Sequence, residues 1–187
     1  MKFDFTYHTD LSSLHVNCEK PRAYFIPYAD EKSALADNRA KSTNLISLCG
    51  DWDFKFYESY RQIDDFLCDD FSTEAFDKMT VPRSWQTVEG KGYDKPAYIN
   101  DGYVFPIDPP NIPTDIPCGL YVRDLYVSES FLEKEVYINF EGVDSCYYLF
   151  VNNKFAGYST VSHMTSEINI TKYLKKGENT LKVLVFK

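Results

Sequence analysis

The second half of the chain alternates between apolar and polar residues with the period of β-strands. In "EVYINFEGV", Val136, Ile138 and Phe140 face one way and the residues between them face the other. "CYYLFVNNKFAGYS" predicts a hairpin, because Asn152 and Asn153 can adopt the positive φ that a two-residue turn requires. "LYVRDLYV", "EINIT" and "KKGENTLKVLVFK" predict further strands. Short strands joined by tight turns indicate an all-β fold, a β-sandwich or jelly roll.

The first half has one strong element. In "SLCGDWDFKFYES", Trp52, Phe54 and Phe56 alternate with charged residues. This is the pattern of a strand with one solvent-exposed face. "TVPRSWQ" predicts a short strand that runs into a proline-anchored turn, and "SYRQIDDFLCDDF" predicts a short helix. Residues 1–45 are polar and contain two prolines, so we expect an extended arm with one weak helical turn in "DEKSALADNRA". Residues 46–187 would then form the jelly-roll domain. The chain stops on a strand, which suggests a boundary inside a longer protein.

Composition narrows the class of protein. Of 187 residues, 44% are hydrophobic and 17% aromatic, which favours half-buried pleated surfaces. A net charge of −8 argues against nucleic acid or an anionic membrane as partner, since both require basic patches. Five scattered cysteines without a C-x-x-C pair are typical of reduced thiols rather than of disulfides or a zinc site. Neither a signal peptide nor an apolar run long enough to span a bilayer is visible, so we expect a cytoplasmic protein.

Catalytic and metal-binding motifs are missing from the sequence. The three histidines have no metal-ligand spacing, and the eight dispersed glycines form neither a phosphate loop nor a nucleophile elbow. Glu141 and Asp144 in "FEGVDS" could serve as an acid/base pair, but 28 acidic residues produce such neighbours by chance. The sequence therefore predicts no metal site, no catalytic residue and no complete active site.

One long segment, "YDKPAYINDGYVFPIDPPNIP" (93–113, the proline-rich loop), has neither strand nor helix period. Its prolines fix φ near −65° and lower the entropy of the unfolded loop, so it can hold one shape without regular hydrogen bonds. Its tyrosines and Phe105 can pack beneath the loop or stack on a sugar ring. In one interpretation the loop only covers the edge of the sandwich. In the other, Asn100 presents an uncharged amide, with one acceptor and two donors, to sugar hydroxyls.

Eight segments of this sequence resemble, in order, the N-terminal sugar-binding domain of glycoside hydrolase family 2. They are "SLCGDWDFKF", "VPRSWQ", "GYDKPAYIN", "FPIDPPNIP", "CGLYVRD", "FEGVDSCYYLFVNNKFAGYS", "SEINIT" and "LKKGENTLKVLVF". The similarity covers about residues 15–187. The long loop and the arm before it look most like the β-galactosidase branch of the family.

The resemblance implies a jelly roll that precedes an immunoglobulin-like domain and a (β/α)8 barrel in a longer parent enzyme. In the family, the two glutamates of a retaining mechanism lie on that barrel. The "Y-x-N" asparagine of the family, which reaches the galactose subsite, matches Asn100, so a β-galactoside is the expected ligand. Asp101 is a further substrate-binding candidate, although the family often has an apolar residue there. By the same resemblance, the parent enzyme uses Mg and Na and is a homo-oligomer, whereas this chain itself is expected to hold no cofactor.

The sequence departs from the family pattern after "GYS" and in the following strand. Thr160 and Val161 replace a common Gln-Gly, and His163 replaces a common Arg, near a loop where some relatives hold a divalent ion. Ile168 and Asn169 replace a common Phe-Asp, for which we expect only a packing effect.

Three functions stay open at this point. The chain is the non-catalytic N-terminal domain of a β-galactosidase, inactive alone, that completes the galactosyl subsite and supports assembly. Alternatively, it is a free-standing carbohydrate-binding module, or a purely structural and oligomerisation domain of another family 2 glycosidase, such as a β-glucuronidase or β-mannosidase.

Overall fold

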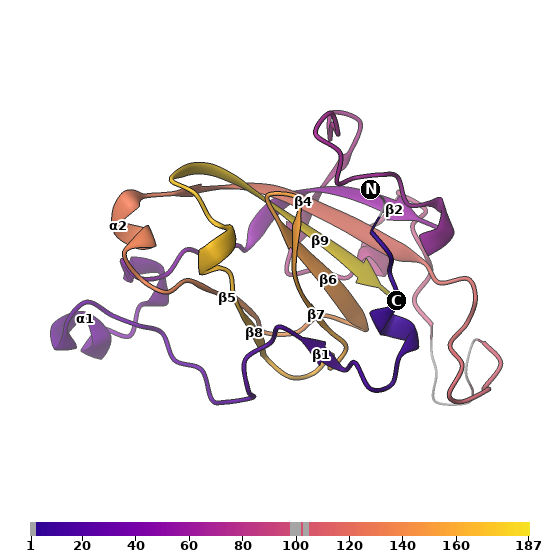
Figure 1. Cartoon of the computed structure of the whole chain (residues 1–187), viewed down its shortest axis with the longest axis horizontal. Coiled ribbons are helices and arrows are strands. Elements are labelled where there is room, and N and C mark those ends of the chain that lie inside the picture. Colours follow the sequence, from indigo (N-terminus) through magenta and orange to yellow (C-terminus); the bar gives the residue numbers. More distant parts are fainter. Residues whose placement is uncertain (1–2, 98–101, 103–104) are drawn as a thin grey trace.

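The computed structural model describes residues 3–97, 102 and 105–187. Within them, nine strands and two short helices are present (Figure 1). The strands are β1 (His15–Val16), β2 (Gly50–Tyr57), β3 (Asp77–Val81), β4 (Cys118–Val127), β5 (Tyr137–Phe140), β6 (Cys146–Val151), β7 (Lys154–Ser159), β8 (Ser166–Asn169) and β9 (Gly177–Phe186), and the helices are α1 (Glu31–Leu35) and α2 (Glu129–Leu132). The predicted all-β jelly-roll fold is confirmed.

Seven strands form the main sheet, in the order β1-β7-β6-β9-β4-β2-β3, and every pairing is antiparallel. Its centre is the pair β4 and β9, which runs in register over ten residues from Cys118↔Phe186 to Val127↔Gly177. A second sheet contains only β5 and β8.

The centre of the main sheet is buried on both faces, which explains why β6 is apolar throughout. In β6, Tyr147, Leu149 and Val151 face one core, and Tyr148 and Phe150 face the other. All six residues of β6 are buried. A strand covered on both sides reads as a continuous apolar run, because neither face alternates with solvent.

The second sheet and the proline-anchored turn cover the first face. Ile138 of β5 and Ile168 of β8 join the same core as Trp52, Phe54 and Trp85. Trp52 and Trp85 are buried, so the predicted core position of Trp52 and the structural turn at Trp85 are confirmed. Ile168, which departs from the family pattern, is fully buried.

The start of the arm covers the opposite face. Phe3, Phe5 and Tyr7 are partly buried and pack against the core that contains Tyr148 and Phe150. The ring centroids of Phe5 and Tyr148 are 5.2 Å apart, edge to face, a favourable arrangement for aromatic pairs. The first residues of the arm are therefore packed against the sheet. Further along the arm, β1 pairs with β7 and forms one edge of the sheet.

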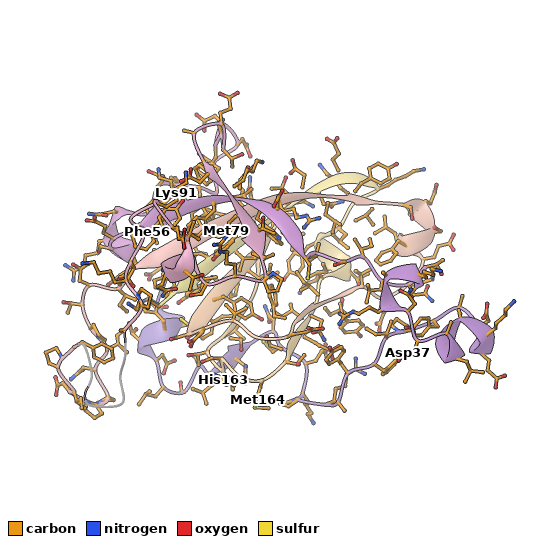
Figure 2. The ribbon with its side chains drawn as sticks, turned by 180° about the vertical axis from the view of Figure 1, so that it is seen from behind. Asp37, Phe56, Met79, Lys91, His163 and Met164 are labelled. Atoms are coloured by element: carbon orange, nitrogen blue, oxygen red, sulfur yellow. The ribbon has the colours of Figure 1, made fainter. Side chains whose placement is uncertain are left out.

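The middle of the arm carries the predicted helical turn. It is α1, whose N-terminus is capped by Asp30, with Ser33 completing a capping box. Figure 1 shows α1 at one end of the molecule and the proline-rich loop at the other. Figure 2, from behind, likewise shows Asp37 far from Lys91, which lies just before the loop.

The hairpin prediction is confirmed, and the helix prediction after β2 is wrong. Asn152 and Asn153 have φ of 50° and 62°, as the two-residue turn requires. The segment expected to be helical forms one 3-10 turn, Tyr60–Gln62, followed by irregular turns. The carbonyl of Phe66 accepts a hydrogen bond of 2.5 Å from the buried Lys182 side chain. A side chain from a distant strand thus binds a backbone carbonyl that would have accepted an intrahelical hydrogen bond in a helix.

Truncating the arm's aromatic contact tests whether the second core depends on it. Phe5→Ala should lower the free energy of unfolding by about 2 kcal/mol, because a partly buried ring and its contacts to Phe66, Tyr148 and Phe150 are lost. Urea unfolding of the 187-residue chain measures this. Thr6→Ala, at the exposed neighbouring position, is the control and should change stability by less than about 0.5 kcal/mol. Equal stability of Phe5→Ala and wild type would show that the arm is only loosely attached.

Candidate sugar-binding loop

The two sequence-predicted substrate residues, Asn100 and Asp101, lie outside the described residues. The structure does describe the stems of their loop, residues 93–97 and 105–117. Both stems lie at the end of the main sheet at which β9 ends and β4 begins (Figure 1). This end of the sheet holds each stem through a different set of contacts.

The first stem is fastened through Tyr93 and Asp94. The Tyr93 hydroxyl donates to the Asp77 carboxylate on β3, and the Lys91 ammonium pairs with the same carboxylate. The Tyr93 ring packs at 5.2 Å from Phe54 and 5.6 Å from Phe56. The expectation that loop tyrosines pack beneath it is thereby confirmed for Tyr93.

The electrostatics of this stem follow from those contacts. The hydrogen bonds from Lys91 and then Tyr93 lower the pKa of Asp77. Burial, followed by the hydrogen bond to Asp77, raises the pKa of Tyr93. The stem is therefore held by an ionised carboxylate and a neutral phenol throughout the neutral pH range.

The second stem is fastened by main-chain bonds. The carbonyl of Ile116 accepts from the Tyr60 N–H at 2.9 Å, and that of Pro117 accepts from the Lys187 N–H at 3.0 Å. Lys187 also binds the first stem, since its side chain pairs with Asp94. One residue at the end of β9 thus joins both stems.

The second stem also has a local turn and exposed apolar groups. Asn111 donates its backbone N–H to the Asp108 carbonyl at 2.7 Å and its side-chain amide to the Asp108 carboxylate at 3.0 Å. Phe105 and Ile107 are 45% and 66% exposed. Large exposed apolar side chains on a braced loop are typical of a surface that contacts another body.

Sequence reasoning did not find the stem partners Asp77, Asp94 and Lys187. Lys187 and Asp94 are 93 positions apart, and their pairing depends on how β9 and the loop meet in the fold. Each is an ordinary charged residue in its local sequence, so no local signal could have identified it.

Glu141, one member of the candidate acid/base pair with Asp144, does not have the environment of a general acid. Glu141 accepts hydrogen bonds from the Tyr24 hydroxyl at 2.6 Å and from Arg39 at 2.9 Å. These bonds lower the pKa of Glu141, whereas a general acid requires a raised pKa. Glu141 instead attaches the arm to the end of β5.

The described residues contain no group of three or more His, Cys, Asp or Glu side chains that could hold a metal ion. His8 packs against Phe186, His15 lies in β1, and His163 is exposed. All five cysteines are free thiols, of which Cys118 and Cys146 are buried. Across the described ranges, no helix is long and apolar enough to cross a membrane.

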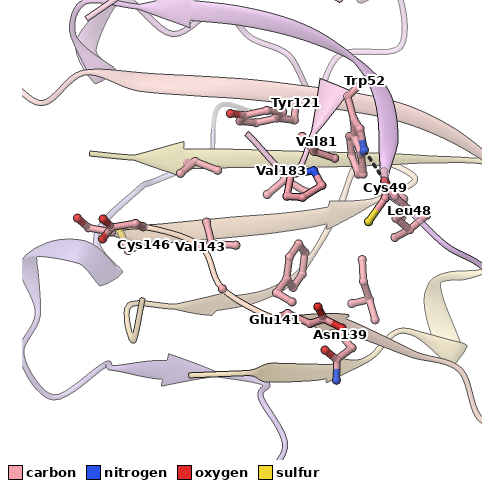
Figure 3. A pocket seen from close by; sticks show the side chains of 18 of the residues that line it. Leu48, Cys49, Trp52, Val81, Tyr121, Asn139, Glu141, Val143, Cys146 and Val183 are labelled. Carbon is pink, nitrogen blue, oxygen red and sulfur yellow. Dashed lines mark hydrogen bonds between the residues drawn. The ribbon is translucent and has the colours of Figure 1, made fainter. Parts of the chain in front are cut away.

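A large apolar cleft lies between the two sheets. Its volume is about 2050 Å³, and it is bounded on one side by Trp52, Val81 and Tyr121 of the main sheet and on the other by β5. Figure 3 shows Trp52 and Tyr121 on one side of this cleft and Asn139 and Glu141 on the opposite side. Most of its lining is apolar, although Arg39, Asn139 and Glu141 are among the residues at its rim and walls.

Comparison with known proteins identifies the class of domain. The family model "Glycosyl hydrolases family 2, sugar binding domain" matches residues 45–187. The chain belongs to this family.

Proteins with similar sequences include β-galactosidases. The chain is 42% identical over 182 residues to the β-galactosidase of Actinobacillus pleuropneumoniae and 38% identical to that of Staphylococcus xylosus. Each match covers 97% of this chain but only 17% and 18% of the relative. The chain therefore spans about a sixth of the length of these enzymes.

Solved structures with the same fold include other glycosidases. A β-glucuronidase from an uncultured Clostridium sp. matches with a TM-score of 0.55 and 21% identity over 74% of this chain and 21% of that one. A β-D-mannosidase from Dictyoglomus thermophilum matches with a TM-score of 0.51 and 22% identity over 75% of this chain and 15% of that one. These similarities show the fold alone.

The first stem provides a test that does not depend on the loop's tip. Asp77→Asn removes the charge that binds Lys91 and weakens the bond to Tyr93, so at pH 7 trypsin should cleave faster after Lys91, which precedes Gly92. Glu89→Gln, the same chemical change at an exposed position nearby, should leave the cleavage rate unchanged. Equal rates in both variants would show that Asp77 does not hold the stem.

The same pair of variants predicts a pH dependence. Because the folded-state pKa of Asp77 is lowered, its stabilising contribution is complete above about pH 4 and is lost as pH falls through the lowered pKa. The stability difference between wild type and Asp77→Asn, measured by urea unfolding, should therefore be present at pH 7 and shrink towards pH 2. A difference that grows on acidification would contradict the assignment.

Proposed function

We propose that this chain is the non-catalytic sugar-binding domain of a β-galactosidase, which hydrolyses terminal β-D-galactosides with retention. The catalytic glutamates would lie on another domain, and this domain would complete the galactosyl subsite. The family match supports the domain type, and 42% identity to a β-galactosidase supports the substrate class.

Asn100 is the residue proposed to contact the sugar, with Asp101 as a second candidate. The observation that carries the proposal is the attachment of both loop stems to Lys187 and to the end of the main sheet. A loop held at both ends can present one amide in a fixed position, which reduces the entropy lost when a ligand binds. An uncharged amide also leaves the ionisation of catalytic carboxylates unchanged.

The remaining domains of the parent enzyme are the proposed partners of the exposed loop side chains. An immunoglobulin-like domain and a barrel are expected from family resemblance, as are a homo-oligomeric state and the use of Mg and Na. No catalytic step is assigned to this chain's own residues.

Removing the proposed sugar contact should lower catalysis in the parent enzyme. Asn100→Ala should reduce kcat/KM on an aryl β-galactoside several-fold, since one neutral hydrogen bond contributes about 0.5–1.5 kcal/mol. Substrates that lack the 2-, 3-, 4- or 6-hydroxyl of galactose identify the contact. Asn100→Ala should not lower kcat/KM on the substrate that lacks the hydroxyl to which Asn100 bonds. Asn111→Ala, in the same loop but bonded to Asp108, is the control for loop disturbance. Unchanged kinetics of Asn100→Ala on every substrate would exclude the contact.

Binding by the isolated chain separates this proposal from a free-standing carbohydrate-binding module. Such a module presents exposed aromatic rings, whereas Trp52 and Trp85 are only 5% and 4% exposed. We therefore expect no saturable heat in isothermal titration with galactose or lactose up to millimolar concentrations. Clear saturation in that range would favour the module instead.

A further inference from the structure

The second sheet has one occupied and one open edge. On the β8 side, the arm pairs with it through a bridge between Cys18 and Ile168, and the Glu19 N–H donates to the Glu167 carbonyl at 2.8 Å. On the β5 side, no strand pairs with the outer edge in the part of the chain that the structure describes.

The pairing pattern shows which backbone groups face that open edge. The Val136 carbonyl accepts from the Ile170 N–H at 2.9 Å, so these two residues form a hydrogen-bonded pair. Hydrogen-bonded and non-hydrogen-bonded pairs alternate along an antiparallel ladder, so Ile138 and Phe140 also direct their backbone groups towards β8. The N–H and C=O groups of Tyr137 and Asn139 must therefore face outward.

The apolar cleft adjoins this edge and contains unused polar atoms. Residues of β5 line one of its sides and Trp52, Val81 and Trp85 line another. The indole N–H of Trp85 is buried and has no acceptor among the described residues, and the side-chain oxygen of Asn139 is equally unpartnered. Trp85 is only 4% exposed. A buried donor without a partner is costly, which favours an occupant that carries a carbonyl group.

We propose that an extended polypeptide segment pairs with the outer edge of β5 as a third strand of the second sheet and fills the cleft. The backbone of an extended segment can pair with the outward N–H and C=O groups of Tyr137 and Asn139. It can also provide a carbonyl group that accepts a hydrogen bond from the indole N–H of Trp85. Its side chains should alternate, with large apolar residues directed between the sheets and polar residues directed outward.

The occupant is a segment of the same β-galactosidase polypeptide, which rests on the proposed function. The relatives are about six times longer than this chain, so such a polypeptide is available in them. A four-residue edge offers few bonds, so a separate molecule should bind it only weakly, whereas a covalently connected segment has an effective concentration in the millimolar range. This argument disfavours a second copy of the chain.

The experiment uses the 187-residue chain and synthetic peptides. Overlapping 15-residue peptides cover the part of the Actinobacillus pleuropneumoniae β-galactosidase outside the 182 aligned residues. Both tryptophans of the chain line the cleft, so intrinsic fluorescence reports binding directly. One peptide, or one overlapping set, should bind saturably. The same peptide with N-methyl groups on alternate amides should lose at least tenfold in affinity, because it cannot pair as a strand.

Two pairs of variants locate the binding. Asn139→Pro removes one outward N–H and no backbone bond to β8, at a place where edge strands tolerate proline, and should weaken binding at least tenfold; Asn139→Pro and Asn139→Ala both lose the side-chain bond to Glu167. Asn139→Ala keeps that N–H and should bind within threefold of wild type. Trp85→Phe should weaken binding several-fold, whereas Trp52→Phe, whose indole N–H donates to the Leu48 carbonyl, should have a smaller effect. Circular dichroism confirms that each variant is folded.

Three outcomes would overturn the inference. They are the absence of binding by every peptide, equal affinity of wild type and Asn139→Pro, and self-association of the chain in sedimentation equilibrium that Asn139→Pro abolishes. The last outcome would make a second copy the occupant. None of them depends on the kinetics of Asn100→Ala, so failure here and failure of the proposed function can be told apart.

Discussion

Burial of the main sheet on both faces is the constraint from which the other features follow. β6 is apolar on each side and most of β9 is buried, so each face needs its own cover. The chain provides two different covers, a second sheet on one side and the aromatic start of the arm on the other. Because these covers come from distant parts of the sequence, packing on the sheet joins the start of the arm, β5 and β8 into one unit. The incomplete cover over β2 and β3 leaves the apolar cleft.

The same architecture determines where polar chemistry can be placed. With both faces enclosed, the ends of the sheet are free to carry irregular segments that offer fixed polar groups. The proline-rich loop occupies the end where β4 begins and β9 ends, and charged residues fasten its stems. Glu141, at the end of β5, is an ionised attachment point for the arm. The described part of the domain thus fixes the positions of polar groups, and the catalytic glutamates are proposed to lie elsewhere in the parent enzyme.

Much of the fold follows from local pattern, and the rest depends on long-range contacts. Alternation predicts β2, β5 and the hairpin at Asn152, because period and turn chemistry are local properties. The alternation of Phe3, Phe5 and Tyr7 was also present in the sequence and could have indicated that the arm packs on a core. The segment after β2 has the apolar spacing of a helix, yet Lys182 binds the Phe66 carbonyl and Asp64 binds Tyr57. Such tertiary bonds, like that between Asp94 and Lys187, cannot be derived from neighbouring residues. Asn100 and Asp101 lie outside the described residues, so their assignment depends on sequence resemblance.

The position of Lys187 has a mechanical consequence. Its backbone N–H bonds to the second stem and its side chain pairs with the first, so this residue, directly after β9, fastens both stems. A displacement of β9 along its axis would act on both described stems together, because both are bonded to Lys187. The central strand of the sheet and the two stems of the proposed sugar-binding loop are thereby mechanically coupled through one residue.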